Sequence, residues 1–216
     1  MNKWMILMVL FSILLLPACN STQYSNGASL PLFNGTDLTG WHNPYEWGTT
    51  TVVDNEIHLL GNKKFFLLTD NAYDDFIFEV EVKMPEGKSN SGFLFRCLEE
   101  KNKAWGYQAE VDPSARSWSG GLYDEGRRGW IHPKKPVKNN PYNDQHWTSQ
   151  RKAAFKRYDW NHYKIRCKGD HIQIWVNDVL TTDLHDDVDQ SGPIGLQHHG
   201  EKGKLYRFRN IKIKKI

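Results

Sequence analysis

The stretch FIFEVEVKM, residues 76–84, decides the fold class of this chain. In an extended strand, successive side chains point to opposite faces. One face of this stretch is therefore entirely apolar, whereas the other carries the charged residues Glu79, Glu81 and Lys83 beside Ile77. A period of two with one wet face is typical of an antiparallel sheet that packs on a core through one side.

Further short runs rich in β-branched and aromatic residues recur on both sides of this stretch, and turn sequences separate them. Asp54-Asn55, Lys168-Gly169-Asp170 and Asn177-Asp178 suit hairpin turns. We therefore predict an all-β fold, a sandwich or jelly roll of two antiparallel sheets. The stretch 126–160 shows no clear strand, and a loop of that length in a compact domain is usually functional or disordered. The four tryptophans between Trp105 and Trp147 argue against disorder. The expected strands are 51–53, 56–60, 65–68, 76–84, 91–98, 107–111, 121–123, 161–168, 171–176, 194–199 and 205–213.

The first residues, MNKWMILMVLFSILLLPACN, have the layout of an export signal. Lys3 precedes an apolar run that is too short for a comfortable membrane span. Leu16-Pro17-Ala18-Cys19 resembles the bacterial lipobox, whose cysteine is lipidated and becomes the new N-terminus; plain secretion is the alternative. We expect a signal peptide (1–18), a lipidated tether (19–29) and one domain (30–216). Because Asn20 follows the cysteine, we expect a lipid-anchored protein of the cell envelope, on the periplasmic face of the outer membrane.

The charge balance argues against some partners. The net charge of +3 is too small to indicate a nucleic-acid partner. Contact with a membrane is expected only through the lipid anchor, and the oligomeric state stays open. Cys97 and Cys167 remain after Cys19. In an oxidising compartment they could pair, or they could be two buried thiols.

A row of polar side chains on one predicted strand is the strongest sign of a site. In GYQAEVDP (106–113), Tyr107, Ala109 and Val111 would face the core. Gln108, Glu110 and Asp112 would then line the opposite face together. Two carboxylates and an amide suit acid–base chemistry or the recognition of sugar hydroxyls. Close carboxylates also separate in pKa, which leaves one of them poised to accept a proton. Asp112, before Pro113, could instead be a turn residue.

Two further segments carry candidate residues. In NSGFLFR (90–96), Phe93, Phe95 and Cys97 would share one face, and Arg96 would be either half of a structural ion pair or a donor to a ligand. In GLQHHG (195–200), Gln197 and His199 share one face, opposite Leu196 and His198. The Gly-rich segment from Gly120 to Trp130 adds polar and aromatic candidates: Tyr123, Arg127, Arg128 and Trp130.

Cofactor signals are weak. No tight His/Cys spacing indicates zinc. The run HDDVD (185–189) could ligate calcium through oxygen or could be a solvated loop, so a divalent cation is left open and no cofactor is predicted with certainty. Nine tryptophans and nine tyrosines could stack on sugar rings or fill the core.

Together these segments resemble the bacterial 3-keto-disaccharide hydrolase family, formerly a domain of unknown function, which has a concanavalin A-like jelly-roll fold. The matching segments run in order through the domain: LFNGTDLTGW (32–41), YDDFIFEVEVKM (73–84), SNSGFLFR (89–96), GYQAEVDP (106–113), GGLYDEGRRGW (120–130), WNHYKIRCKGDHIQIWVND (160–178), GPIGLQHHG (192–200) and FRNIKIKKI (208–216). One departure is Asp178, where the family often has glycine after Asn; Asn-Asp can still make that turn.

The resemblance implies an enzyme that cleaves glycosides oxidised at C3. The ketone acidifies the proton on C2, a base removes it, the group on C1 leaves, and water then adds, so the net result is hydrolysis. Our catalytic candidates are Glu110 as the base, His199 as the second choice, and Asp112. The candidates for binding an oligosaccharide or glycoside are Arg96, Gln108, Tyr123, Arg127, Arg128, Trp130 and Gln197. The alternatives are a non-catalytic carbohydrate-binding module, because the same fold hosts many lectins, and an enzyme acting on ordinary glycans.

Overall fold

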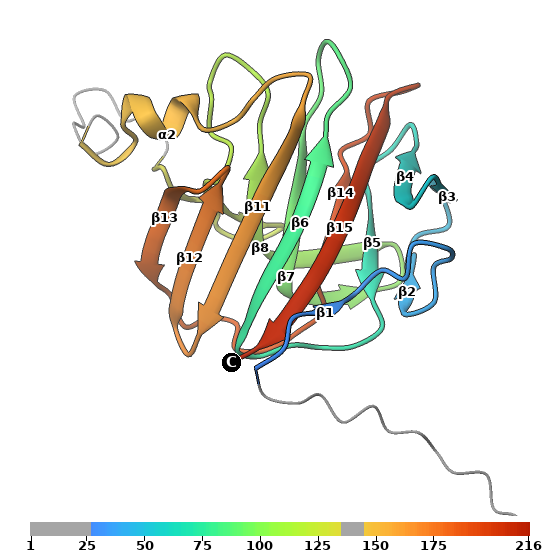
Figure 1. Cartoon of the computed structure of the whole chain (residues 1–216), viewed down its shortest axis with the longest axis horizontal. Helices are drawn as coiled ribbons and strands as arrows, with labels where there is room; N and C mark the ends of the chain where they lie inside the picture. Colours follow the sequence, from blue (N-terminus) through green and yellow to red (C-terminus); the bar gives the residue numbers. More distant parts are fainter. Residues whose placement is uncertain (1–26, 135–144) are drawn as a thin grey trace, which may run out of the picture.

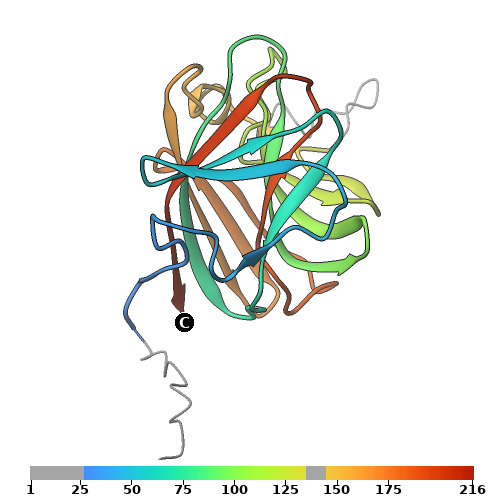
Figure 2. The same cartoon turned by 90° about the vertical axis from the view of Figure 1, so that its right-hand side faces the viewer.

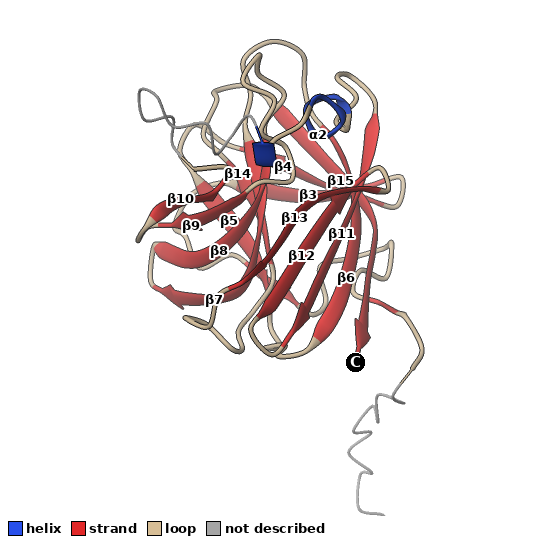
Figure 3. Ribbon diagram, turned by 90° about the vertical axis from the view of Figure 1, so that its left-hand side faces the viewer, coloured by secondary structure: helices blue, strands red, loops and turns tan. Residues whose placement is uncertain are grey.

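A computed structural model describes residues 27–134 and 145–216 of the chain. Within these residues, antiparallel strands form two sheets that pack face to face (Figure 1 and Figure 3). The predicted all-β sandwich of two antiparallel sheets is thereby confirmed. The expected signal peptide, Cys19 and most of the tether lie outside the described residues. In the described part of the chain, no helix is long and apolar enough to cross a bilayer.

The eight-stranded sheet has the order β13-β12-β11-β6-β15-β4-β3, with β1 paired to β15. β1 pairs with the end of β15, so the chain enters the domain beside its C-terminus (Figure 2). The strands are β1 (Leu30–Pro31), β3 (Thr49–Val53), β4 (Glu56–Leu60), β6 (Phe76–Lys83), β11 (Trp160–Lys168), β12 (His171–Val176), β13 (Val179–His185) and β15 (Leu205–Lys215).

The seven-stranded sheet has the order β10-β9-β8-β7-β14-β5-β2 and carries the candidate site. A short helix, α2 (Ser149–Ala153), precedes β11. The strands are β2 (Trp41–His42), β5 (Phe65–Thr69), β7 (Ser91–Glu100), β8 (Lys103–Val111), β9 (Leu122–Glu125), β10 (Gly129–His132) and β14 (Gly195–His198).

The core lies between the two sheets. Along β6, the residues predicted to face inward are buried and their neighbours are partly exposed. Phe93 of the seven-stranded sheet meets Phe78, Tyr163 and Phe208 of the other sheet edge to face, with ring centroids 6.0, 5.0 and 6.0 Å apart. Each such aromatic pair adds about 1 kcal/mol beyond the area that it buries.

Some elements escaped prediction because their side chains do not alternate. The stretch 126–160, expected to lack strands, contains β10 and α2; residues 135–144 lie outside the described residues. The pairing of β10 with β9 shifts register between Trp130 and His132. In β13, consecutive residues Thr181 and Thr182 are both buried, opposite a register shift in β12. Irregular pairing of this kind removes the period of two.

The two cysteines are buried free thiols, as one of the two alternatives predicted. Burial raises the pKa of Cys167 to about 12, which keeps its thiol protonated and unreactive. The prediction that Cys97 shares a face with Phe93 and Phe95 is wrong. A bulge between Phe95 and Leu98 turns Cys97 away from the face of Phe93, so that it packs with Leu94 on the outer side of the sheet.

Candidate functional site

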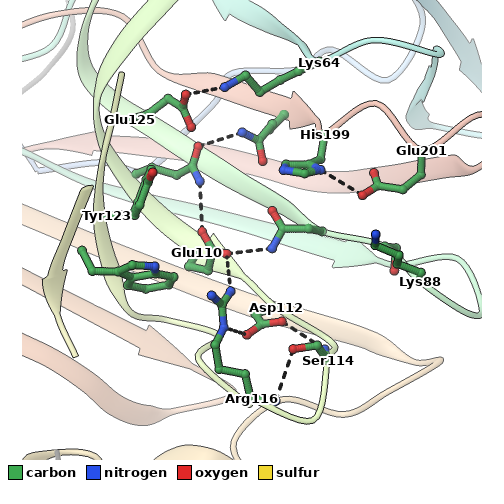
Figure 4. Close-up of a pocket in the computed structure, with 15 residues that line it drawn as sticks. Lys64, Lys88, Glu110, Asp112, Ser114, Arg116, Tyr123, Glu125, His199 and Glu201 are labelled. Carbon is green, nitrogen blue, oxygen red and sulfur yellow. Dashed lines mark hydrogen bonds and ion pairs between the residues drawn. The ribbon is translucent and has the colours of Figure 1, made fainter. Parts of the chain in front are cut away.

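A pocket of about 390 Å³ opens on the outer face of the seven-stranded sheet, away from the core between the sheets. This volume lies in the lower part of the range for small-molecule sites. Figure 4 shows Asp112 and Arg116 beside Glu110, and His199 with Glu201 across from it. The lining residues are Lys64, Lys88, Ser89, Asn90, Gln108, Glu110, Asp112, Ser114, Arg116, Tyr123, Glu125, Trp130, Gln197, His199 and Glu201.

The row on β8 forms the floor of this pocket. Tyr107, Ala109 and Val111 belong to the core, as the alternation predicted. Gln108 and Glu110, and Asp112 just after the strand, line the pocket. The predicted cluster of two carboxylates and an amide on one face is therefore present.

Glu110 is a buried carboxyl that can exchange a proton near neutrality. Burial raises its pKa to about 7, and the charge of Asp112 adds to the shift, while Asn90 and Arg116 oppose it. Asn90 Nδ2 donates to Glu110 Oε1 at 2.7 Å, and Arg116 Nη2 donates to the same oxygen at 3.3 Å. A group with this pKa is available both as a base and as an acid at neutral pH.

Asp112 is the charged member of the pair. Burial alone would raise its pKa, but hydrogen bonds from Ser114 and Arg116 outweigh burial and lower the pKa below the usual value. Arg116 Nε donates to Asp112 Oδ2 at 2.7 Å, and the backbone N–H groups of Ser114 and Trp118 donate at 3.1 and 3.2 Å. The two carboxyls are thus split in pKa, one ionised and one poised, as expected of neighbouring acids. Asp112 also makes the local turn that was its alternative role.

An aromatic wall stands beside the carboxyls. The Arg116 guanidinium lies over the Trp118 and Trp130 rings, 4.8 and 4.7 Å from their centroids. Trp130 meets Trp118 and Tyr123 edge to face, at 4.6 and 5.2 Å. The wall combines flat apolar surface with a fixed positive charge, which suits a ligand with apolar faces and electron-rich oxygens.

A chain of side-chain amides crosses the floor from β14 to β8. Gln197 Nε2 donates to Gln108 Oε1 at 3.0 Å, and Gln108 Nε2 donates to Glu110 Oε2 at 3.0 Å. The intervening strand β7 offers Gly92, where a Cβ would lie 2.4 Å from Gln108 Cδ. Only glycine leaves room for this chain.

His199 stands on the opposite wall, held by two further groups. Its Nδ1 lies 2.9 Å from Glu201 Oε1, and Tyr206 donates its hydroxyl hydrogen to Glu201 Oε2 at 2.5 Å. Burial alone would raise the pKa of Glu201, but Tyr206 and His199 outweigh it and lower the pKa. An ionised carboxylate only accepts hydrogen bonds, so the hydrogen of this contact belongs to His199 Nδ1.

The alternation predicted around His199 is confirmed. Gln197 and His199 line the pocket, whereas Leu196 lies in the core. His198 faces inward and stacks on Phe65 and Tyr206.

The predicted role of Arg96 as a ligand contact is wrong for this pocket. The bulge in β7 gives Arg96 a φ of +47° and turns its side chain into the protein, where it is fully buried. It donates to the carbonyls of Asp74 at 2.8 and 2.7 Å, of Gly169 at 2.7 Å and of Asp189 at 3.2 Å, and it pairs with Asp75 at 3.2 Å. Arg96 therefore holds loops together, which agrees with the structural alternative.

Arg127 and Arg128 also lie outside the pocket lining, contrary to prediction. Arg127 pairs with Asp124 and Asp189, and Arg128 with Asp124 and Asp186. The same contacts engage the acidic run 185–189 that had been considered for calcium. Among the described residues, no three His, Cys, Asp or Glu side chains are grouped to hold a metal ion.

Several lining residues were missed from the sequence. Glu125 lies two positions beyond Tyr123 in β9, so the period of two could have found it, whereas Glu201 follows the end of β14, where that period no longer applies. Arg116, Asn90, Lys64 and Lys88 come from loops, where no such period applies. Lys64 pairs with Glu125 across the pocket.

Solved structures with the same fold agree on the class of this domain. The carbohydrate binding module CBM66 from Bacillus subtilis superposes with a TM-score of 0.60 and 22% identity, over 82% of this chain and 97% of that one. A protein with a galectin-like fold from Bacillus subtilis superposes with a TM-score of 0.61 and 12% identity, over 89% of this chain and 98% of that one. At such identities the likeness shows the fold alone, which is the concanavalin A-like jelly roll that was predicted.

The family follows from the sequence. A family model described as a 3-keto-alpha-glucoside-1,2-lyase-like domain matches residues 29–214, and the chain belongs to this family. The levanase of Bacillus subtilis (strain 168) is 24% identical over 162 residues, or 74% of this chain. The chain spans only 21% of the length of that relative.

Proposed function

We propose that this protein cleaves 3-keto-glycosides by elimination at C1 followed by addition of water. The observation that carries the proposal is Glu110, a buried carboxyl with a pKa of about 7 on the floor of an open pocket. Membership of the family described as 3-keto-alpha-glucoside-1,2-lyase-like supports this substrate class.

The residues supply the groups that such a reaction needs. Ionised Glu110 takes the proton from C2, and the C2–H electron pair forms an enolate with the C3 ketone. The C1–O bond then breaks, its electron pair leaves with the glycosidic oxygen, and an acid protonates that oxygen. Water adds at C1 and a proton returns to C2. Arg116 is placed to stabilise the enolate oxygen. His199 on the opposite wall is placed to exchange a proton with the leaving oxygen.

The test follows release of free sugar from a 3-keto-disaccharide. Glu110→Gln is expected to lower kcat by about 10²- to 10⁴-fold, the usual contribution of a general base. Glu79→Gln, the same change on the outer face of the other sheet, is the control and should match the wild type. An unchanged rate in Glu110→Gln would remove this carboxyl from the mechanism.

A non-catalytic carbohydrate-binding role is the second candidate. It is favoured by the aromatic side chains of Trp130 and Tyr123, which line the pocket, and by the likeness to a carbohydrate binding module. Binding of unoxidised oligosaccharides without turnover of the keto form would support it. A panel of substrates with and without prior oxidation at C3 also separates both roles from an enzyme on ordinary glycans.

We also propose that the protein works at the cell envelope, held by lipid on Cys19 at the periplasmic face of the outer membrane. The lipobox-like sequence before Cys19 and Asn20 after it support this location.

A further inference from the structure

The row of hydrogen-bonded amides across the pocket floor begins at Gln197, and one atom of this amide has no hydrogen bond. Gln197 is fully buried and lines the pocket, and its Oε1 has no partner among the described residues. A buried acceptor without a hydrogen bond has lost its contact with water and gained nothing in exchange, so it destabilises the free protein. The position therefore calls for a hydrogen-bond donor from a ligand, and a sugar hydroxyl has the required chemistry.

The donor and acceptor roles in the hydrogen bonds from Gln197 to Gln108 and from Gln108 to Glu110 depend on whether Glu110 carries a proton. Oε1 of Glu110 faces the amide of Asn90 and the guanidinium of Arg116, and a guanidinium can only donate. Because Oε1 already accepts from two donors and Oε2 from only one, the geometry favours a proton on Oε2, where Gln108 Nε2 now donates. The new O–H group on Oε2 needs an acceptor, and rotation of the Gln108 amide presents its oxygen to Glu110 in place of its NH₂ group.

The reversal then passes to Gln197. Once Gln108 has rotated, its NH₂ group faces Gln197, which can accept only through Oε1. Gln197 must rotate in turn, and its Nε2 takes the place that the unpartnered Oε1 occupied. Gly92 makes this concerted step sterically feasible, because no side chain on β7 separates the two amides.

We propose that Gln197 determines which ligand atom the site accepts at this point and that the protonation of Glu110 switches its polarity. With charged Glu110, Gln197 offers an acceptor to a sugar hydroxyl. With neutral Glu110, it offers a donor to a carbonyl or enolate oxygen. The sugar assignment rests on the proposed function, whereas the reversal is a property of the free protein and is testable without any activity.

Other titratable groups surround Glu110, and the charges of Asp112 and Arg116 act on its pKa. On its own strand and the following loop these are Asp112 and Arg116; from β9, Tyr123; and from β11 in the other sheet, Tyr163, whose hydroxyl donates to the Glu110 carbonyl at 3.0 Å. The more distant pocket walls contribute Lys64, Lys88, Glu125, His199 and Glu201. None of these side chains belongs to the row of amides. Removal of the Gln108 amide therefore distinguishes a reversal relayed through hydrogen bonds from a direct electrostatic effect of Glu110 on Gln197.

The experiment is an NMR titration of the free protein between about pH 5 and 9. The side-chain NH₂ signals of Gln108 and Gln197, identified with Gln108→Met and Gln197→Met, are expected to shift with the same midpoint as the Glu110 carboxyl carbon. The shifts should vanish in Glu110→Gln. In Gln108→Met, Glu110 should still titrate while the Gln197 signals no longer follow it. The backbone amide spectrum of each variant confirms that it is folded.

Three results would overturn the proposal. The Gln197 signals could stay constant while Glu110 titrates, they could still follow Glu110 in Gln108→Met, or Glu110 could fail to titrate in this range. None of these results depends on turnover, so failure of the proposed enzyme activity is distinguished from failure of the switch.

Discussion

Glu110 places a titratable group on the pocket floor where its side chain is almost fully buried, and this position affects folding as well as chemistry. Its pKa of about 7 in the folded protein stands above the ordinary value of 4.5. Between these values the folded state holds the proton and the unfolded state has lost it. The free energy of unfolding therefore falls as the pH rises through this window, by about 3 kcal/mol in total.

Glu110→Gln removes this pH dependence. The stability of the variant relative to the wild type is expected to rise by about 3 kcal/mol between pH 4.5 and pH 7.5, because only the wild type must bury a charge at the higher pH. Urea unfolding of both proteins at several pH values measures the difference. If the two stability curves run parallel over this range, Glu110 does not have the raised pKa.

Arg96 gives a second prediction at the scale of one residue. Arg96→Met leaves the carbonyls of Asp74, Gly169 and Asp189 without their donor, so a loss of at least about 3 kcal/mol is expected. Arg127→Met is the comparison, since the Arg127 side chain is partly exposed and should cost less. Chemical unfolding measures both. Equal small losses would contradict the structural role assigned to Arg96.

At the scale of elements, the hairpin turns provide a matched pair of backbone tests. Asp178 has a φ of +67°, in the left-handed region that favours glycine. Glycine removes the strain of this positive φ, but it also stabilises the unfolded chain through its greater conformational freedom. The net expectation for Asp178→Gly is a rise of about 0.5 kcal/mol in the free energy of unfolding. Gly169 has a φ of +54° and open space around it, so Gly169→Ala should cost about 1 kcal/mol through the backbone alone. Thermal unfolding distinguishes the two signs, and a loss in Asp178→Gly would contradict the argument.

The same elements show how far sequence reasoning reaches. The alternation in β6 and β8 predicts the core, and with it the pocket floor of Gln108, Glu110 and Asp112, because a paired strand repeats every two residues. The prediction for Arg96 failed at a bulge, where one extra residue reverses the facing of everything after it. Arg116 could not be found, because loop geometry brings it back over Asp112 and no periodicity records that.

At the scale of the whole molecule, the pocket and the strand β1, where the described chain enters the domain, lie at different ends. β1 joins β15 at Leu30 and Ile213, and Ile213 pairs with Phe78 near the start of β6. From there β6 runs along the sandwich to Lys83, and the loop beyond it brings Asn90 to the pocket. The five residue steps from Phe78 to Lys83 span about 17 Å. Figure 1 shows β1 beside the C-terminus, whereas the loop that follows β6 lies at the other end of the sandwich.

If Cys19 carries the lipid, its removal should release the protein without changing the pocket. Cys19→Ala removes the residue expected to carry the lipid, so the protein should move from the membrane fraction to the soluble fraction of the cell envelope. Because the pocket lies far from the point where the tether enters, kcat and KM for a soluble 3-keto-glycoside should match those of the wild type. Fractionation followed by a rate assay measures both. A variant that stays with the membrane would remove Cys19 as the anchor, whereas a changed KM after release would mean that the tether contributes to the site.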